Sequence, residues 1–145
     1  MKPYKYRLSP RPPHKDALNR LKVTNEGERL TGFVKGQEAS ELEERFARAL
    51  DQQGKSYDFQ VEVRTPRTVP GQENLIDFVV EDEFPTEIDG EFVHKTAAQR
   101  ADDRDRDAIL NDHIKNYGWK PIVRVTEMDV ETQEDANRKV GEMFP

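Results

Sequence analysis

The feature that most constrains this chain is the stretch 75–94, in which acidic side chains interrupt two apolar runs. Asp77 lies inside the first run, and Glu87 and Asp89 lie at the end of the second. Burying an unpaired charge is costly, so Asp77 in a buried strand needs a partner or a bound cation. Glu87 and Asp89 are two residues apart, so in a strand they point to the same face. Carboxylates from adjacent strands supply the oxygen ligands that Mg²⁺ prefers, and the stretch therefore predicts a metal site.

The composition fits one domain with a modest core. The chain has 145 residues, of which 36% are charged and 34% apolar. It contains no cysteine, which excludes disulfides and thiolate metal sites. No apolar run is long enough for a signal peptide or a membrane span. We therefore expect an intracellular, cytoplasmic protein that does not associate with membranes.

Charge is distributed unevenly along the chain. Residues 1–37 carry nine Lys or Arg and three acids, a net charge of +6. Because the whole chain carries −6, the remaining residues carry −12. Several prolines also break up this segment, and we predict a basic N-terminal extension at 1–37 followed by one domain at 38–145. Such an arm either contacts phosphates or is a solvated tail, and charge alone does not decide between the two.

From Ser40 onward the pattern becomes regular. Ser40 and Glu43 form a capping-box signature, S-x-x-E, at the start of a helix that Gly54 ends. Strands are expected at 57–63, 75–80 and 86–89, a helix at 95–116, a strand at 121–125 and a helix at 133–143. In the first strand the alternation predicts exposed side chains at Asp58, Gln60 and Glu62; in the long helix the residues expected to face the core are Ala98, Ala101, Ala108, Leu110, Ile114 and Tyr117. This order, α-β-β-β-α-β-α, predicts an α/β sandwich with a mixed sheet.

The acids in this arrangement suit phosphate chemistry. A Mg²⁺ ion on Asp77 and Glu87 would activate water and neutralise charge on a phosphate. Glu43 is a candidate further ligand, and His94 a candidate for proton transfer. Each also has a structural interpretation. Asp77 would be a strand-end carboxylate capped by backbone groups or paired with an arginine, and Glu87 and Asp89 would lie on an exposed strand face that ends in an Asp-Gly turn. Glu43 would serve only in the capping box, and His94 would have a structural role.

At this point the sequence resembles the PD-(D/E)XK nuclease superfamily. The resemblance rests on IDFVV followed by PTEIDGEFVHKT and by DRDRDAILNDHIKNYGWKPIVRV, and it covers roughly 40–125. It is closest to the branch of the very-short-patch-repair endonuclease and related phage homing endonucleases. The resemblance implies a restriction-endonuclease-like α-β-β-β-α-β sandwich with a mixed four-stranded sheet, here with an added C-terminal helix, in a bacterial or phage-encoded protein.

The resemblance also implies residue roles. Asp77 would be the central metal ligand, Glu87 the second acid and Glu43 the acid on the first helix, with Mg²⁺, or Mn²⁺ in its place, as cofactor. Asp89 stands where the superfamily usually has a lysine, a departure typical of the patch-repair branch. His94 then becomes the candidate for proton transfer, and Lys95 a charge that stabilises the transition state.

These expectations lead to a metal-dependent DNA endonuclease or nickase that hydrolyses phosphodiester bonds. DNA is the expected partner, and the oligomeric state is open, with a homodimer as one possibility. The candidate DNA contacts are Arg64, Arg67, Arg100 and Arg104. Gln99 and Arg106 are also able to face the site. A solvated helix face laced with ion pairs explains the helical residues equally well. Two alternatives stay open: a catalytically inactive nuclease-like module that binds nucleic acid or assembles through the basic arm, and a purely structural protein.

Overall fold

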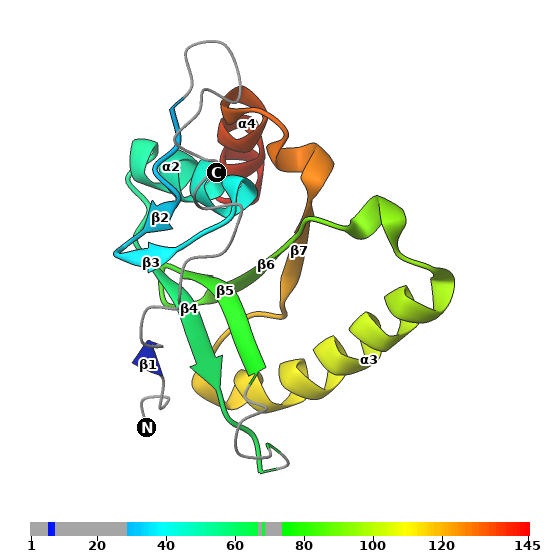
Figure 1. Cartoon of the computed structure of the whole chain (residues 1–145). Helices are drawn as coiled ribbons and strands as arrows, with labels where there is room; N and C mark the ends of the chain where they lie inside the picture. The colour runs from blue at the N-terminus through cyan, green and yellow to red at the C-terminus, as the bar shows by residue number, and fades with distance from the viewer. Residues whose placement is uncertain (1–5, 8–28, 67, 69–73) are drawn as a thin grey trace. The chain divides into compact units, whose positions relative to one another are not determined.

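The structure, a computed structural model, describes residues 6–7, 29–66, 68 and 74–145 (Figure 1). These residues form two compact units. The sheet unit consists of the described residues of 1–8 and 56–126, and the helical unit consists of those of 9–55 and 127–145. Most of the N-terminal extension, and Arg67 with much of the loop around it, lie outside the described residues.

The helical unit is built around α2 (Glu41–Gln52) and α4 (Gln133–Met143), which pack against each other. The predicted capping box is present: the Ser40 hydroxyl accepts the Glu43 N–H, and the Glu43 carboxylate accepts the Ser40 N–H at 2.8 Å. Gly54 follows the helix with φ of 70°. Both helices therefore lie where capping and periodicity predict them.

A short hairpin precedes α2. Strands β2 (Phe33–Val34) and β3 (Gln37–Glu38) are joined by Lys35 and Gly36, both with positive φ, as a two-residue hairpin turn requires. The buried carboxylate of Glu44 on α2 fixes the chain before the hairpin, because it accepts the backbone N–H groups of Thr31 at 2.8 Å and Gly32 at 2.7 Å. A 3-10 turn, η3 (Glu127–Val130), leads into the last helix.

The sheet unit contains the predicted mixed sheet. Strands β4 (Tyr57–Val63), β5 (Asn74–Val80) and β6 (Phe84–Asp89) pair antiparallel in sequence order, and β7 (Val123–Thr126) pairs parallel to β6. The two-residue β1 (Tyr6–Arg7) lies at the opposite edge, beside β4. The order α2-β4-β5-β6-α3-β7-α4 is the one that the sequence predicts, and the chain has an α/β fold.

One strand changes the face that it presents. Phe59 on β4 packs against Phe78, whereas Val61, only two residues later, belongs to a separate hydrophobic cluster with Leu110. Side chains two apart share a face in a regular strand, so the alternation is interrupted between them. Gln60 lies at this point with φ of 57°, in the left-handed region. The predicted exposure of Gln60 and Glu62 is therefore wrong: each is only 3% exposed.

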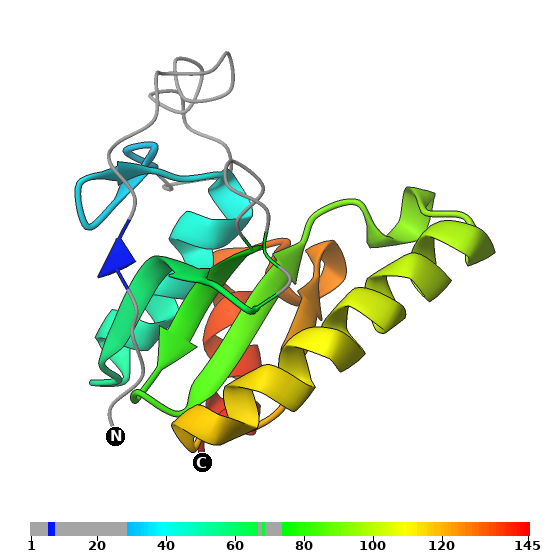
Figure 2. The ribbon, with the colours of Figure 1, turned by 90° about the horizontal axis from the view of Figure 1, so that it is seen from below.

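The crossover helix α3 (Ala97–Ile114) runs along the sheet (Figure 2). It follows the 3-10 turn η1 (Phe92–His94) and leads into η2 (Lys115–Tyr117), which Gly118 closes with φ of 82°. Its C-terminal part joins a cluster made up of Val61, Val63, Ile76, Val79, Leu110, Ile114 and Trp119.

The predicted core face of α3 is only partly right. Leu110 and Ile114 are buried, but Ala98 and Ala108 are exposed. Both views show the N-terminal turns of α3 extending past the strands, so Ala98 there has no sheet to cover it (Figures 1 and 2). Ala108 lies two residues before the buried Leu110, on the opposite side of the helix. Between the N-terminal turns and Leu110, the positions of α3 that face the sheet carry charged side chains instead, namely Asp103, Arg106 and Asp107. None of the described helices has the length and apolarity needed to cross a membrane.

Candidate functional site

Asp77 and Glu87 lie side by side in the sheet. Phe78 on β5 faces Thr86 on β6, so the next step of the antiparallel register places Asp77 opposite Glu87. The two carboxyl groups are close enough to share a proton. Asp77 Oδ2 also accepts the backbone N–H of Ile88 at 2.8 Å, which fixes the orientation of this carboxylate. The structure thus joins the two acids that the sequence selects as metal ligands.

The environment of Glu87 disfavours its charge. Its side chain is almost fully buried, and this burial raises the pKa of Glu87. Arg106 Nη1 lies 3.3 Å from Glu87 Oε1 and lowers the pKa, as does the hydrogen bond with Asp77, but the two only partly offset the effect of burial. A carboxyl group in this state gains from any further positive charge placed beside it.

Asp89 holds a lysine. It lies two residues after Glu87 on the same strand face, and its Oδ2 is 3.0 Å from Lys95 Nζ. The same ammonium group is 2.6 Å from Asp103 Oδ2 on α3. Desolvation lowers the pKa of Lys95, but the hydrogen bonds that its ammonium donates to Asp103 and Asp89 outweigh it and raise that pKa. Lys95 is therefore a fixed, charged group that joins the end of β6 to α3.

A second link joins α3 to β7. Arg124 binds Asp107 through two nitrogens, at 2.7 and 2.9 Å, in the fork geometry of a bidentate pair. Its Nη1 also lies 3.9 Å from Asp89 and 4.0 Å from Asp103. The hydrogen bond with Asp107 raises the pKa of Arg124 above its already high value, so this guanidinium stays charged.

Together these groups form one charge cluster on the sheet face that α3 covers. Its members are five carboxylates, Asp77, Glu87, Asp89, Asp103 and Asp107, and three cations, Lys95, Arg106 and Arg124. With every group ionised, five negative and three positive charges leave a net charge of −2. One divalent cation would balance it.

Two carboxylates are what the site offers such a cation. Within the described part of the chain, no group of three or more His, Cys, Asp or Glu side chains is arranged to hold a metal. Mg²⁺ is commonly held by one or two carboxylates and keeps several waters. Asp77 and Glu87 fit that requirement, and the burial of Glu87 gives them a reason to bind positive charge.

The other predicted site residues are more scattered. His94 is exposed in η1, and its ring has no hydrogen bond or ion pair to any described residue. Glu43 lies in the helical unit, where it completes the capping box. Arg64 is paired with Glu62, and Arg104 is exposed without an ion pair among the described residues. Arg67 lies outside the described residues.

Arg100 is held by its own surroundings. Its guanidinium lies 4.3 Å from the centre of the Phe92 ring and donates to the Phe92 carbonyl at 3.0 Å. It ties η1 to α3 and does not point freely toward a ligand.

The sequence interpretation missed three members of the cluster. Asp103, Asp107 and Arg124 were given no site role, although they neutralise or surround residues that were, and although Asp107 and Arg124 belong to the motifs that carry the resemblance. Asp103 and Asp107 are four residues apart and therefore share a helix face. A repeat of charges on the inward face of a helix that crosses an acid-bearing sheet is the signal that would have found Asp103 and Asp107.

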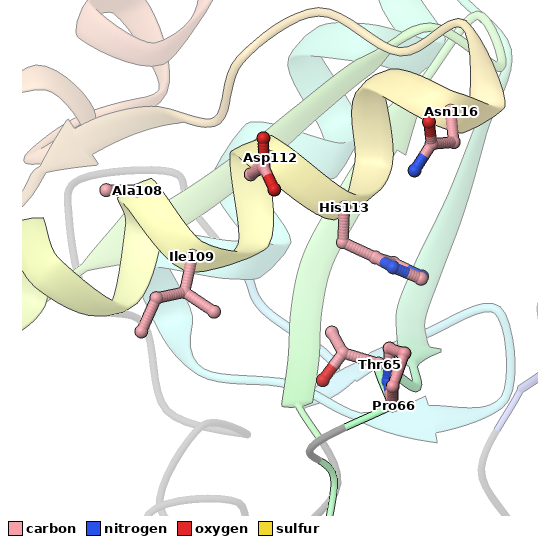
Figure 3. A pocket seen from close by; sticks show the side chains of 7 residues that line it. All are labelled: Thr65, Pro66, Ala108, Ile109, Asp112, His113 and Asn116. Atoms are coloured by element: carbon pink, nitrogen blue, oxygen red, sulfur yellow. The ribbon is translucent and has the colours of Figure 1, made fainter.

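A separate pocket of about 480 Å³ lies at the other end of α3 (Figure 3). Figure 3 shows side chains of α3, including Ile109 and His113, above Thr65 and Pro66, which follow β4. His113 Nε2 lies 2.8 Å from the Tyr117 hydroxyl. None of the eight members of the charge cluster lines this pocket, so it is not part of the candidate site.

Comparison of the chain with protein-family models, curated proteins and solved structures finds no match.

Proposed function

We propose that this chain is a metal-dependent DNA endonuclease or nickase of the PD-(D/E)XK type. Two features support the proposal. The element order α2-β4-β5-β6-α3-β7 is the one that this resemblance implies. The two principal acids lie on β5 and β6, where the resemblance requires them.

The observation that carries the proposal is the Asp77–Glu87 pair within a cluster of net charge −2. Asp77 and Glu87 would hold Mg²⁺, or Mn²⁺ in its place. When bound, the ion would lower the pKa of a coordinated water and neutralise charge on the phosphate. The remaining chemistry belongs to the side chains around the pair.

Lys95 supplies the positive charge in this proposal. Asp89 occupies the position of the usual lysine, and the Lys95 ammonium is hydrogen-bonded to that same Asp89. Lys95, six positions after Asp89, thus supplies an amine at the end of β6, where the usual lysine would stand. Asp89 then acts as a positioning residue, and Lys95 stabilises negative charge on the phosphate. His94, exposed beside Lys95, is the proposed proton donor to the leaving oxygen.

Cleavage of supercoiled plasmid in Mg²⁺ or Mn²⁺ tests this function. We expect conversion to nicked or linear DNA that requires the metal and is lost in Asp77→Asn and Glu87→Gln. Asp105→Asn is the matched control, because Asp105 is an exposed acid on α3 outside the cluster. Cleavage that persists in both site variants would contradict the assignment.

A second function is favoured by a specific observation. Each cation of the cluster already touches a carboxylate, so the network also satisfies its own charges in large part. This suits a catalytically inactive module that binds nucleic acid through the basic arm. Such a module would retain DNA without cutting it, would lose it on deletion of residues 1–37, and would bind more weakly as salt rises.

Filter binding with and without Mn²⁺ separates the two functions. The inactive module predicts the same steep salt dependence under both conditions and intact DNA after incubation. Binding that does not respond to salt would exclude it.

A further inference from the structure

The three cations of the cluster are held with different strength. Arg124 makes two short contacts with Asp107, at 2.7 and 2.9 Å, and Lys95 makes one of 2.6 Å with Asp103. Hydrogen bonds between ionised nitrogen and oxygen groups usually span about 2.7–2.9 Å. These contacts fix Arg124 and Lys95 in place as links between α3 and the sheet.

Arg106 differs from both. Its Nη1 lies 3.3 Å from Glu87 and 3.4 Å from Asp107, and its Nη2 donates to the Leu75 carbonyl at 3.2 Å. All three contacts are long, and none is bidentate. Its side chain is 35% exposed, compared with 24% for Arg124. Arg106 is also the one cation of the cluster that forms an ion pair with the Asp77–Glu87 pair.

We propose that Arg106 is an exchangeable counter-ion. It forms the ion pair with Glu87 while no metal is bound, and a divalent cation replaces it at that carboxylate. The inference rests on the proposed function, because it requires a metal at Asp77 and Glu87. Arg106 is in this sense a positioning residue, which fixes the place of the Glu87 side chain in the metal-free protein.

Charge explains why the exchange occurs. A cation on Glu87 and the Arg106 guanidinium would repel each other at this distance, while Asp107 and the Leu75 carbonyl keep Arg106 nearby. The released guanidinium is then available to a phosphate bound at the metal. Arginine suits this second role because its planar fork matches phosphate oxygens. The order of events follows: metal first, then Arg106 on the phosphate.

Calorimetric titration of the full chain with MnCl₂, together with thermal unfolding, tests the proposal. Arg106→Gln removes the competing charge, Arg106→Lys retains it, and Arg138→Gln removes an exposed arginine from α4 as a control for net charge. We expect Arg106→Gln to bind Mn²⁺ about tenfold more tightly, a change of ~1.4 kcal/mol. Arg106→Lys and Arg138→Gln should remain within about twofold of the parent chain.

Thermal unfolding adds a readout that does not depend on activity. Arg106→Gln should unfold at a lower temperature than the parent without metal, yet show a larger rise in unfolding temperature on adding Mn²⁺. A purely structural Arg106 would lower both temperatures equally and leave the rise unchanged, and that result would overturn the inference alone. Absence of any Mn²⁺ response in the parent and in every variant would overturn the proposed metal site as well.

Discussion

Glu87 is the residue whose ionisation the fold opposes most clearly, and this has a consequence for stability. Its pKa is raised from the ordinary value of 4.5, chiefly by burial. The folded chain therefore binds this proton more strongly than the unfolded chain does. The favourable contribution of this proton uptake by Glu87 to the free energy of folding is fully present below pH 4.5, and it is lost as pH rises through the raised pKa.

Glu87→Gln should accordingly raise the free energy of unfolding at pH 7, because the amide mimics the protonated acid. At pH 4 the variant should gain little or nothing, since Glu87 is then protonated in the folded parent. Urea unfolding at the two pH values measures the difference. A variant that is destabilised equally at both would show that the ion pair with Arg106 outweighs the cost of burial.

At this scale the sequence reveals the acids of the strands more readily than the charged residues of α3 that surround them. Asp77 and Glu87 stand out because they interrupt apolar runs, and a charge in such a place needs an explanation. Asp103 and Asp107 lie among many charged residues of α3, some of which are exposed, such as Asp105. Their role depends on which helix face meets the sheet, and that is decided by packing.

Within single elements, Gln60 in β4 has a left-handed backbone conformation, and this predicts that a good strand former at this position destabilises the chain. Valine is a good strand former, yet Gln60→Val should destabilise the chain by about 1–3 kcal/mol, because a β-branched residue is strained at the φ of 57°. Gln60→Gly tolerates this φ and is the control. Urea unfolding compares the two. A valine variant as stable as the glycine variant would mean that β4 can become regular at this point.

A second element-scale prediction concerns the chain segment before α2. Glu44 accepts backbone N–H groups from Thr31 and Gly32. Glu44→Gln should cost about 1–3 kcal/mol, because the amide keeps only one acceptor oxygen and its nitrogen cannot accept from the Thr31 hydroxyl or from Arg48. Amide exchange at residues 31 and 32 should accelerate. Glu41→Gln, at a more exposed acid on the same helix, should change exchange there very little.

The elements themselves were largely predictable. Ser40 and Gly54 set the limits of α2, and Gly118 ends the segment after α3, because capping is a local property. The faces were less predictable. The exposure of Gln60 depends on a backbone angle that no propensity encodes, and the exposure of Ala98 depends on how far α3 extends past the sheet. Both are set by contacts distant in sequence.

For the whole molecule, the net charge of −2 that the cluster carries when every group is ionised predicts a measurable response to divalent cations. Binding to the folded state alone stabilises it by RT ln(1 + [L]/Kd), about 2.7 kcal/mol at a hundredfold excess over Kd. We expect Mg²⁺ and Mn²⁺ to raise the unfolding temperature, and Asp77→Asn to abolish the rise.

A monovalent salt at matched ionic strength controls this experiment, because the chain carries −6 overall and any cation screens it. A rise that survives in Asp77→Asn would place the ion elsewhere in the molecule.

The position of Arg124 has a consequence for how this network tolerates sequence change. Its guanidinium binds Asp107 and lies within 4.0 Å of Asp89 and Asp103 as well. If one of these acids is neutralised, the arginine has two others to turn to, so single substitutions will understate the importance of the network. Paired substitutions should cost more than the sum of their parts. Mutational drift can therefore remove one acid with little penalty, whereas the loss of a second leaves Arg124 with a single carboxylate.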